Sequence, residues 1–171
     1  MKSLGVSRFI DLRSGEARAF LRAFWVLLFT IAAHTVLETA RDALFLTKLP
    51  PRTLGLVYMV TAVAMIALTP LSVRLTRIAG AKNALVVSLL LTAFAAAWFR
   101  IRAPGVATVF GLYVFGALSA TLLVGQFWLV AGTLFTAAQS RRLFGPLASG
   151  GVLGGVAGGG YRERFDFSGS G

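Results

Sequence analysis

The sequence has 171 residues, of which 57% are hydrophobic types and 13% are charged, and its mean hydropathy is +0.79. A soluble domain is usually about 45–50% apolar and about 25% charged, so these values exclude a soluble globular fold. No cysteine, one histidine and six acidic residues exclude disulfides, thiolate or histidine-rich metal sites and a hydrolytic triad. We predict an all-α integral membrane protein, with no enzyme activity, catalytic residues, cofactor or bound metal.

Residues 1–22 form a mixed, basic segment before the first apolar stretch. Five basic residues outnumber two acidic ones there: Lys2, Arg8, Arg13, Arg18 and Arg22 against Asp11 and Glu16. The part from Ser14 to Arg22 fits a short amphipathic helix on the membrane surface, and a solvated leader is the alternative. A cleaved signal peptide is disfavoured, because no small-x-small cleavage site precedes the charged cluster and three more spans follow.

From residue 23 to residue 160 the chain is predicted to be a transmembrane helical domain. Its first three spans cover about residues 23–42, 54–73 and 84–99. Pro50 and Pro51 mark the turn before the second span, because proline lacks the N–H that would continue a helix. A short basic loop separates the second span from the third, which ends at Arg100, Arg102 and Pro104.

The stretch at about 105–135 is predicted to be one long fourth helix. It is too short for two spans and a turn, yet at about 1.5 Å per residue it exceeds a hydrocarbon core of about 30 Å. We expect it to tilt and to end at Arg141-Arg142. A truncated, glycine-rich fifth helix then begins near Pro146 and covers about 146–160. Residues 161–171 are polar, and we expect a truncated or frameshifted ending or a genuine short tail.

Basic residues lie between the apolar segments and form no stripe, so the net charge of +11 does not predict a nucleic-acid partner. It predicts topology instead. With a cytoplasmic N-terminus, ten basic residues fall in the inner segments and five in the outer ones. The five outer residues are Arg41, Lys48, Arg52, Arg100 and Arg102. Because lysine and arginine accumulate in cytoplasmic loops, this bias predicts an N-terminus inside the cell.

A polar row on the first span is the main candidate site. Thr30, His34 and Glu38 follow one another at spacings of four, and Arg41 and Asp42 lie three and four residues after Glu38, which places all five on one helix face. Ionisable groups in a membrane usually face a cavity or a partner, so the row fits a solute pathway. Alternatively, the three charged residues end the helix at the headgroup boundary, and the histidine is a packed, hydrogen-bonded residue.

Two further patterns lie on the later helices. Gln126, with Ser119 and Thr121, either lines a polar path or forms hydrogen bonds between helices. Two rows of glycines repeat every four residues, at Gly150, Gly154 and Gly158 and at Gly151, Gly155 and Gly159. Such rows favour close helix packing. A phosphate-binding loop is disfavoured, because no Lys-Ser/Thr ending follows and no strand precedes.

The segment from His34 to Thr47 resembles the first helix of the ATP/ADP antiporter family of nucleotide transporters, which carries a Lys-Asp pair there. Phe127-Trp128 and the segment from Gln139 to Leu147 look like that family's fourth helix and following loop. In the loop after the second span, Arg77, Gly80 and Lys82 resemble part of a major-facilitator motif, although its Asp is absent. The resemblance covers about residues 16–160 and implies a major-facilitator-like half bundle, the N-terminal portion of a twelve-helix transporter.

By this match Arg41 takes the place of the family's nucleotide-binding lysine. The chain departs from the family at Glu38, where an arginine is usual, and in the fourth helix, which lacks the family's acidic residue. We expect part of a secondary transporter for nucleotides or another organic anion, working by alternating access in a bacterial inner (plasma) membrane. Expected partners are the lipid bilayer and the missing C-terminal helices. The alternative is a non-transporting membrane anchor or sensor module of a larger protein.

Overall fold

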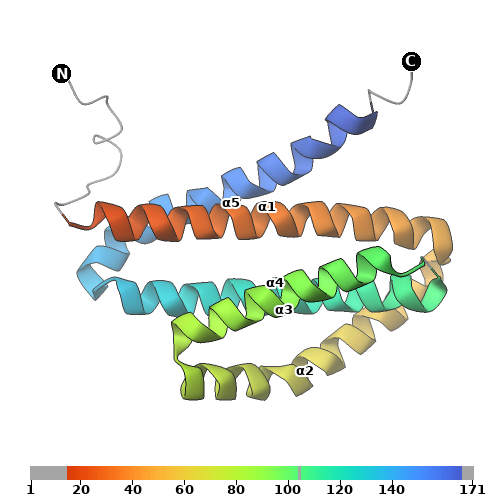
Figure 1. Cartoon of the computed structure of the whole chain (residues 1–171), viewed down its shortest axis with the longest axis horizontal. Helices are drawn as coiled ribbons and strands as arrows, with labels where there is room; N and C mark the ends of the chain where they lie inside the picture. Colours follow the sequence, from red (N-terminus) through yellow and green to blue (C-terminus); the bar gives the residue numbers. More distant parts are fainter. Residues whose placement is uncertain (1–14, 104, 167–171) are drawn as a thin grey trace. The chain divides into compact units, whose positions relative to one another are not determined.

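The computed structural model describes residues 15–103 and 105–166, with side chains up to residue 160. These residues form helices joined by short turns and contain no strand (Figure 1). In chain order the elements are α1 (Ala17–Lys48), the 3-10 turn η2 (Pro51–Thr53), α2 (Leu54–Ala79), α3 (Ala81–Ile101), α4 (Val106–Leu134) and α5 (Ala137–Asp166).

Four of these helical segments are long and apolar enough to cross a membrane. They are Ala17–Lys48, Pro51–Ala79, Ala81–Ile101 and Val106–Leu134, with 32, 29, 21 and 29 residues. Each exceeds the roughly 20 residues that a bilayer requires. The predicted all-helical integral membrane protein with four long apolar helices is therefore confirmed. The glycine-rich α5 is not among the four.

Large apolar side chains on α2 and α3 point away from the protein interior. The exposed fraction is 69% for Met59, 76% for Ile66 and 71% for Phe94. Of the most apolar stretch of Pro51–Ala79, only 6% is buried. Exposure of so large an apolar surface to water would be strongly unfavourable. These faces are therefore suited to contact with lipid.

Helix α1 extends beyond its predicted span at both ends. It begins at Ala17, shortly after Gly15, whose φ of 102° lies in the left-handed region that glycine adopts readily. The Phe20 N–H already donates to the Glu16 carbonyl oxygen at 3.0 Å. No helix breaker separates this turn from the apolar stretch, so the helix begins before the predicted membrane span. At the other end α1 continues to Lys48.

The boundary between α4 and α5 also differs from the prediction. The fourth helix ends at Leu134, close to the limit of the predicted range 105–135 and before Arg141-Arg142, and α5 begins at Ala137, not near Pro146. Thr136 and Gln139 explain the early start, because each binds the other's backbone. The Thr136 N–H donates to Gln139 Oε1 at 2.8 Å, and the Gln139 N–H donates to Thr136 Oγ1 at 3.4 Å. This reciprocal pair is a capping box, a known start signal for helices.

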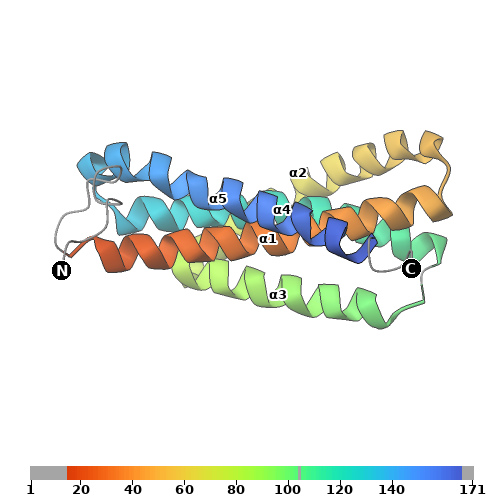
Figure 2. The same cartoon turned by 90° about the horizontal axis from the view of Figure 1, so that it is seen from above.

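The chain divides into two compact units. Unit 1 comprises the described parts of Met1–Val36 and Ala131–Gly171, and unit 2 is Leu37–Val130. In unit 1, α5 lies against the N-terminal part of α1 (Figure 2). A methyl group at Gly154 would overlap the Leu28 carbonyl oxygen, and one at Gly158 would lie 2.6 Å from the Ala32 carbonyl oxygen. Only glycine permits this approach of the two backbones.

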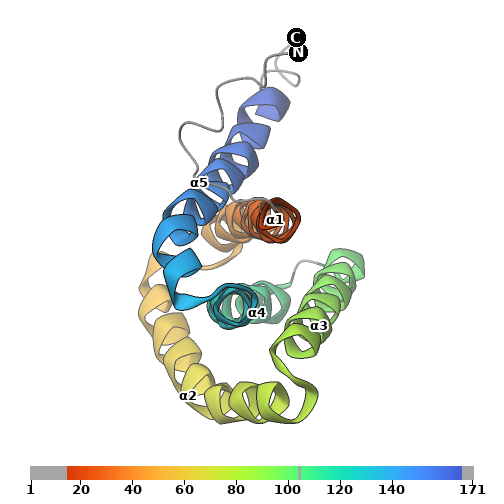
Figure 3. The same cartoon turned by 90° about the vertical axis from the view of Figure 1, so that its left-hand side faces the viewer.

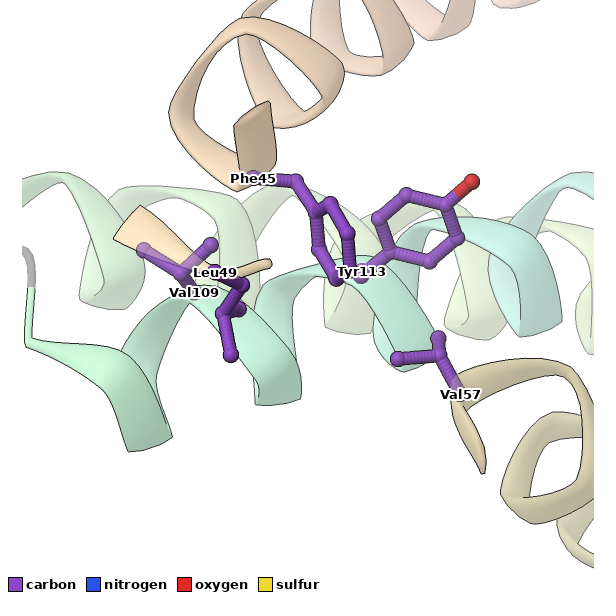
Figure 4. Packing of buried hydrophobic residues seen from close by; sticks show 5 residues of the cluster. All are labelled: Phe45, Leu49, Val57, Val109 and Tyr113. Atoms are coloured by element: carbon purple, nitrogen blue, oxygen red, sulfur yellow. The ribbon is translucent and has the colours of Figure 1, made fainter. Parts of the chain in front are cut away.

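In unit 2, α4 lies between α2 and α3, which curve around it (Figure 3). The best-buried cluster joins the last turns of α1 to α2 and α4, and its members are Phe45, Leu49, Val57, Val109 and Tyr113 (Figure 4). The rings of Phe45 and Tyr113 lie side by side, with their centroids 5.0 Å apart. Helix α2 bends along its length, and we attribute the bend to Pro70 in its interior.

The two glycine rows provide a matched test of packing in unit 1. Gly154→Ala is expected to lower the free energy of unfolding by about 1–3 kcal/mol, because the new methyl group collides with α1 backbone. Gly155→Ala meets its nearest atom at 4.0 Å and is expected to be neutral or to stabilise by up to about 1 kcal/mol through helix propensity. Unfolding in detergent followed by circular dichroism measures both. Equal effects would contradict the close packing of α5 on α1.

Candidate functional site

The candidate site is centred on Arg41, in the part of α1 that belongs to unit 2. Its side chain is 8% exposed, although the helix around it is apolar. Arg41 Nε donates to Asp42 Oδ1 at 3.0 Å, and Arg41 Nη2 lies 3.6 Å from Glu38 Oε1. Both carboxylates come from the same helix, next to Arg41 and one turn before it. The sequence spacing alone therefore brings these three charges together.

Helix α4 supplies the other wall around Arg41. The guanidinium carbon Cζ lies 4.1 Å from the centroid of the Tyr113 ring, a cation–π distance. One turn further along, Gly116 leaves room for the arginine, because a methyl group there would lie 3.1 Å from Nη1 and 3.2 Å from Cδ. Tyr113 in turn packs on Phe45 and lies with its hydroxyl 3.5 Å from that of Tyr58.

The guanidinium has donor capacity that the surrounding residues do not use. Arginine carries five N–H donors in a planar fork. In the described structure Arg41 Nη1 is buried and has no hydrogen-bond partner. Burying an ionised group whose donors are unpaired is costly, especially within a membrane-spanning helix. Chemically, this arrangement is suited to binding a carboxylate or phosphate oxygen from a ligand.

The two carboxylates beside Arg41 are much less buried than the arginine. The side chain of Glu38 is 42% exposed and that of Asp42 is 53% exposed. Much of the surface of both carboxylate side chains is therefore exposed, whereas the Arg41 side chain is almost fully covered by protein. An incoming anion would compete with them for the guanidinium.

Gln126 is buried on α4 and binds α2 rather than Arg41. Its side chain donates from Nε2 to Ser72 Oγ at 3.0 Å, and its Oε1 has no partner among the described residues. Ser119, on the same α4 face, donates to the Gly116 carbonyl oxygen. Thr121 is exposed and donates within its own helix to Ala117. Of the three predicted residues on α4, only Gln126 joins two helices through a hydrogen bond of its side chain.

The predicted row on α1 is divided between the two units. Thr30 and His34 belong to unit 1, whereas Glu38, Arg41 and Asp42 belong to unit 2. The candidate site is therefore built from the last three.

The six predicted packing glycines also fall into two groups. A methyl group at Gly150, Gly154 or Gly158 would lie within 3.2 Å of backbone or ring atoms of α1. The row of Gly151, Gly155 and Gly159 has no atom that close. Only the first row therefore requires glycine for packing within unit 1.

Sequence reasoning missed Tyr113 and Gly116. Both lie in a long apolar stretch, where neither an aromatic residue nor a glycine is distinctive. The only signal was their spacing of three residues. This spacing places the aromatic ring of Tyr113 and the glycine at position 116, which has no side chain, on the same face of α4. That signal does not indicate which neighbouring helix supplies the cation.

The described residues contain no group of three or more His, Cys, Asp or Glu side chains that could hold a metal ion. No protein-family model, curated protein or solved structure matches this chain.

The hydrogen bond between Gln126 and Ser72 predicts unequal effects of removing either partner. Ser72→Ala is expected to lower the free energy of unfolding by about 1 kcal/mol, because the buried amide loses its partner. Gln126→Leu removes the buried polar group altogether and is expected to be neutral or stabilising. Unfolding in detergent tests the order of the two variants. A larger loss for Gln126→Leu than for Ser72→Ala would contradict this account.

Proposed function

We propose that the chain is the N-terminal part of a secondary transporter for an organic anion, of which a nucleotide is the leading candidate. The single observation behind this proposal is the buried Arg41 guanidinium, whose Nη1 has no hydrogen-bond partner among the residues that the structure describes. In a membrane-spanning helix an ionisable side chain is costly, and such residues typically belong to substrate or ion pathways. The resemblance of Arg41-Asp42 to the Lys-Asp pair of ATP/ADP antiporters supports the same substrate class.

The proposed mechanism is alternating access in a major-facilitator-like protein. In that architecture, two six-helix halves rock around a central site near the middle of the bilayer. This chain would supply one wall, with Arg41 binding the anionic group and Glu38 and Asp42 as its counter-ions in the empty state. Gln126 would contribute a further polar group on the same half. Helices beyond this chain would supply the opposite wall.

We further propose a bacterial inner (plasma) membrane location, with the N-terminus in the cytoplasm. The basic residues at the start of the chain, between α2 and α3 and at the start of α5 then all lie inside. Within unit 1, Arg142 Nη2 donates to Glu16 Oε1 at 3.1 Å. This contact fits four crossings between residues 16 and 142, which place both on one side of the membrane, and the choice of the cytoplasmic side rests on the charge bias alone.

Binding of a labelled nucleotide to the purified chain in detergent tests the proposed role of Arg41. Arg41→Gln is expected to weaken ATP and ADP binding at least about tenfold, because a charge-assisted hydrogen bond is lost. Arg41→Lys retains the positive charge but not the planar set of guanidinium donors, so a smaller loss of binding affinity is expected. Arg52→Gln is the control, because Arg52 is exposed in η2.

Equilibrium dialysis against ATP, ADP, citrate and inorganic phosphate separates the outcomes. Binding of any organic anion that depends on Arg41 but not on Arg52 supports the transporter proposal and identifies the class of anion. Equal binding by wild type and Arg41→Gln would contradict it. That result would favour a non-transporting anchor or sensor module, in which Arg41 serves only to hold α1 and α4 together.

Neutralising a carboxylate beside Arg41 is expected to strengthen anion binding. Glu38 lies 3.6 Å from Nη2 and competes with an incoming anion for the guanidinium. Because exposed ion pairs contribute about 0–1 kcal/mol, Glu38→Gln should tighten binding by up to about fivefold. Glu16→Gln, whose acid pairs with Arg142 in unit 1, is the matched control and should have no effect. Weaker anion binding by Glu38→Gln would show that the carboxylate itself contacts the ligand.

A further inference from the structure

A hollow in unit 2 lies between α1, α3 and α4 and is separate from the Arg41 site. Its volume is about 320 Å³. One wall is a row on α1, formed by Leu37, Ala40 and Leu44 at spacings of three and four. The opposite walls carry Ala96 of α3 and Leu112 of α4. Arg41 does not line this hollow, which is therefore a distinct feature of the fold.

The charged residues that line the hollow are both arginines at the end of α3. Arg100 lies in the last turn of α3, and Arg102 is the residue that follows the helix. The Cζ atom of Arg102 lies 4.4 Å from the centroid of the Trp98 ring. Both arginines are exposed, and within the described part of the chain neither takes part in an ion pair. The hollow is thus apolar along its length and cationic at one end.

We propose that this hollow binds an anionic phospholipid, with one acyl chain along its apolar walls and the phosphate on Arg100 and Arg102. A free phosphate or nucleotide would match the arginines but not the leucine and alanine walls. A covering helix would match the walls but would need acidic residues opposite two unpaired arginines. A phospholipid matches both at once, since its phosphate can bind the two arginines and its acyl chain can cover the apolar walls. This inference is independent of the proposed transport function.

Trp98 allows the lipid to be detected directly. The chain has three tryptophans, and replacing Trp25 and Trp128 by phenylalanine leaves Trp98 as the only fluorophore of its kind. This variant is reconstituted in phosphatidylcholine vesicles that contain a small fraction of brominated phosphatidylglycerol or of brominated phosphatidylcholine, which quench nearby tryptophan. The anionic lipid is expected to quench Trp98 with an association constant about fivefold or more above that of the zwitterionic lipid.

Three variants assign that preference to the hollow. Arg100→Gln leaves the stack of Arg102 on Trp98 intact and should reduce the preference about fivefold. Ala96→Leu fills the acyl-chain part of the hollow and should also remove the preference. Arg52 lies in the turn between α1 and α2, which the topology places on the same side of the membrane as Arg100. Arg52→Gln should therefore leave the preference for the anionic lipid unchanged. Circular dichroism confirms the helix content of each variant.

Equal quenching by the two brominated lipids in the parent protein would overturn the proposal. A preference that survives Arg100→Gln combined with Arg102→Gln would overturn it too, because the headgroup would then bind elsewhere. Loss with Arg100→Gln but not with Ala96→Leu would overturn the acyl-chain assignment and leave a headgroup contact alone. Displacement of the brominated lipid by millimolar inorganic phosphate would identify a simple anion site instead.

Discussion

The rest of the structure depends on one interaction, the packing of the buried Arg41 guanidinium against its two carboxylates and the Tyr113 ring. A guanidinium 8% exposed in an apolar helix persists only if nearby groups offset its desolvation. Here Asp42 and Glu38 supply opposite charge from α1, and the Tyr113 ring supplies its electron-rich face from α4. These partners occupy part of the donor fork and, within the described part of the chain, leave Nη1 without a hydrogen-bond partner. The same contact therefore joins two helices and leaves the donor capacity to which we assign anion binding in our proposal.

Glycine makes two close approaches possible in this protein, in different ways. Gly116 leaves space for a side chain, so that Arg41 can lie against α4. Gly154 and Gly158 leave space for backbone, so that α5 can lie against α1 within unit 1. Between helices in lipid there is little hydrophobic driving force, and packing distance matters correspondingly more. Small residues are thus placed where the structure brings a charge or a second backbone close.

The sequence was sufficient to predict the four apolar spans, because length and hydropathy follow directly from residue type. It also predicted that Glu38, Arg41 and Asp42 share a helix face, because that is a local property. The α4–α5 boundary was missed although Thr136 and Gln139 carried the capping signal, since the charge of Arg141-Arg142 was given more weight. Tyr113, Gly116 and the partner of Gln126 depend on which helices pack together, and no local pattern contains that information.

A double-mutant cycle between Arg41 and Tyr113 tests the central claim most directly. Unfolding free energies in detergent are measured for wild type, Arg41→Met, Tyr113→Leu and the double variant, so that losses unrelated to the pair cancel. A desolvated guanidinium on an aromatic face predicts a favourable coupling free energy of about 1–2 kcal/mol. Additive effects of the two substitutions would contradict the placement of Arg41 against α4, and with it the proposed anion site.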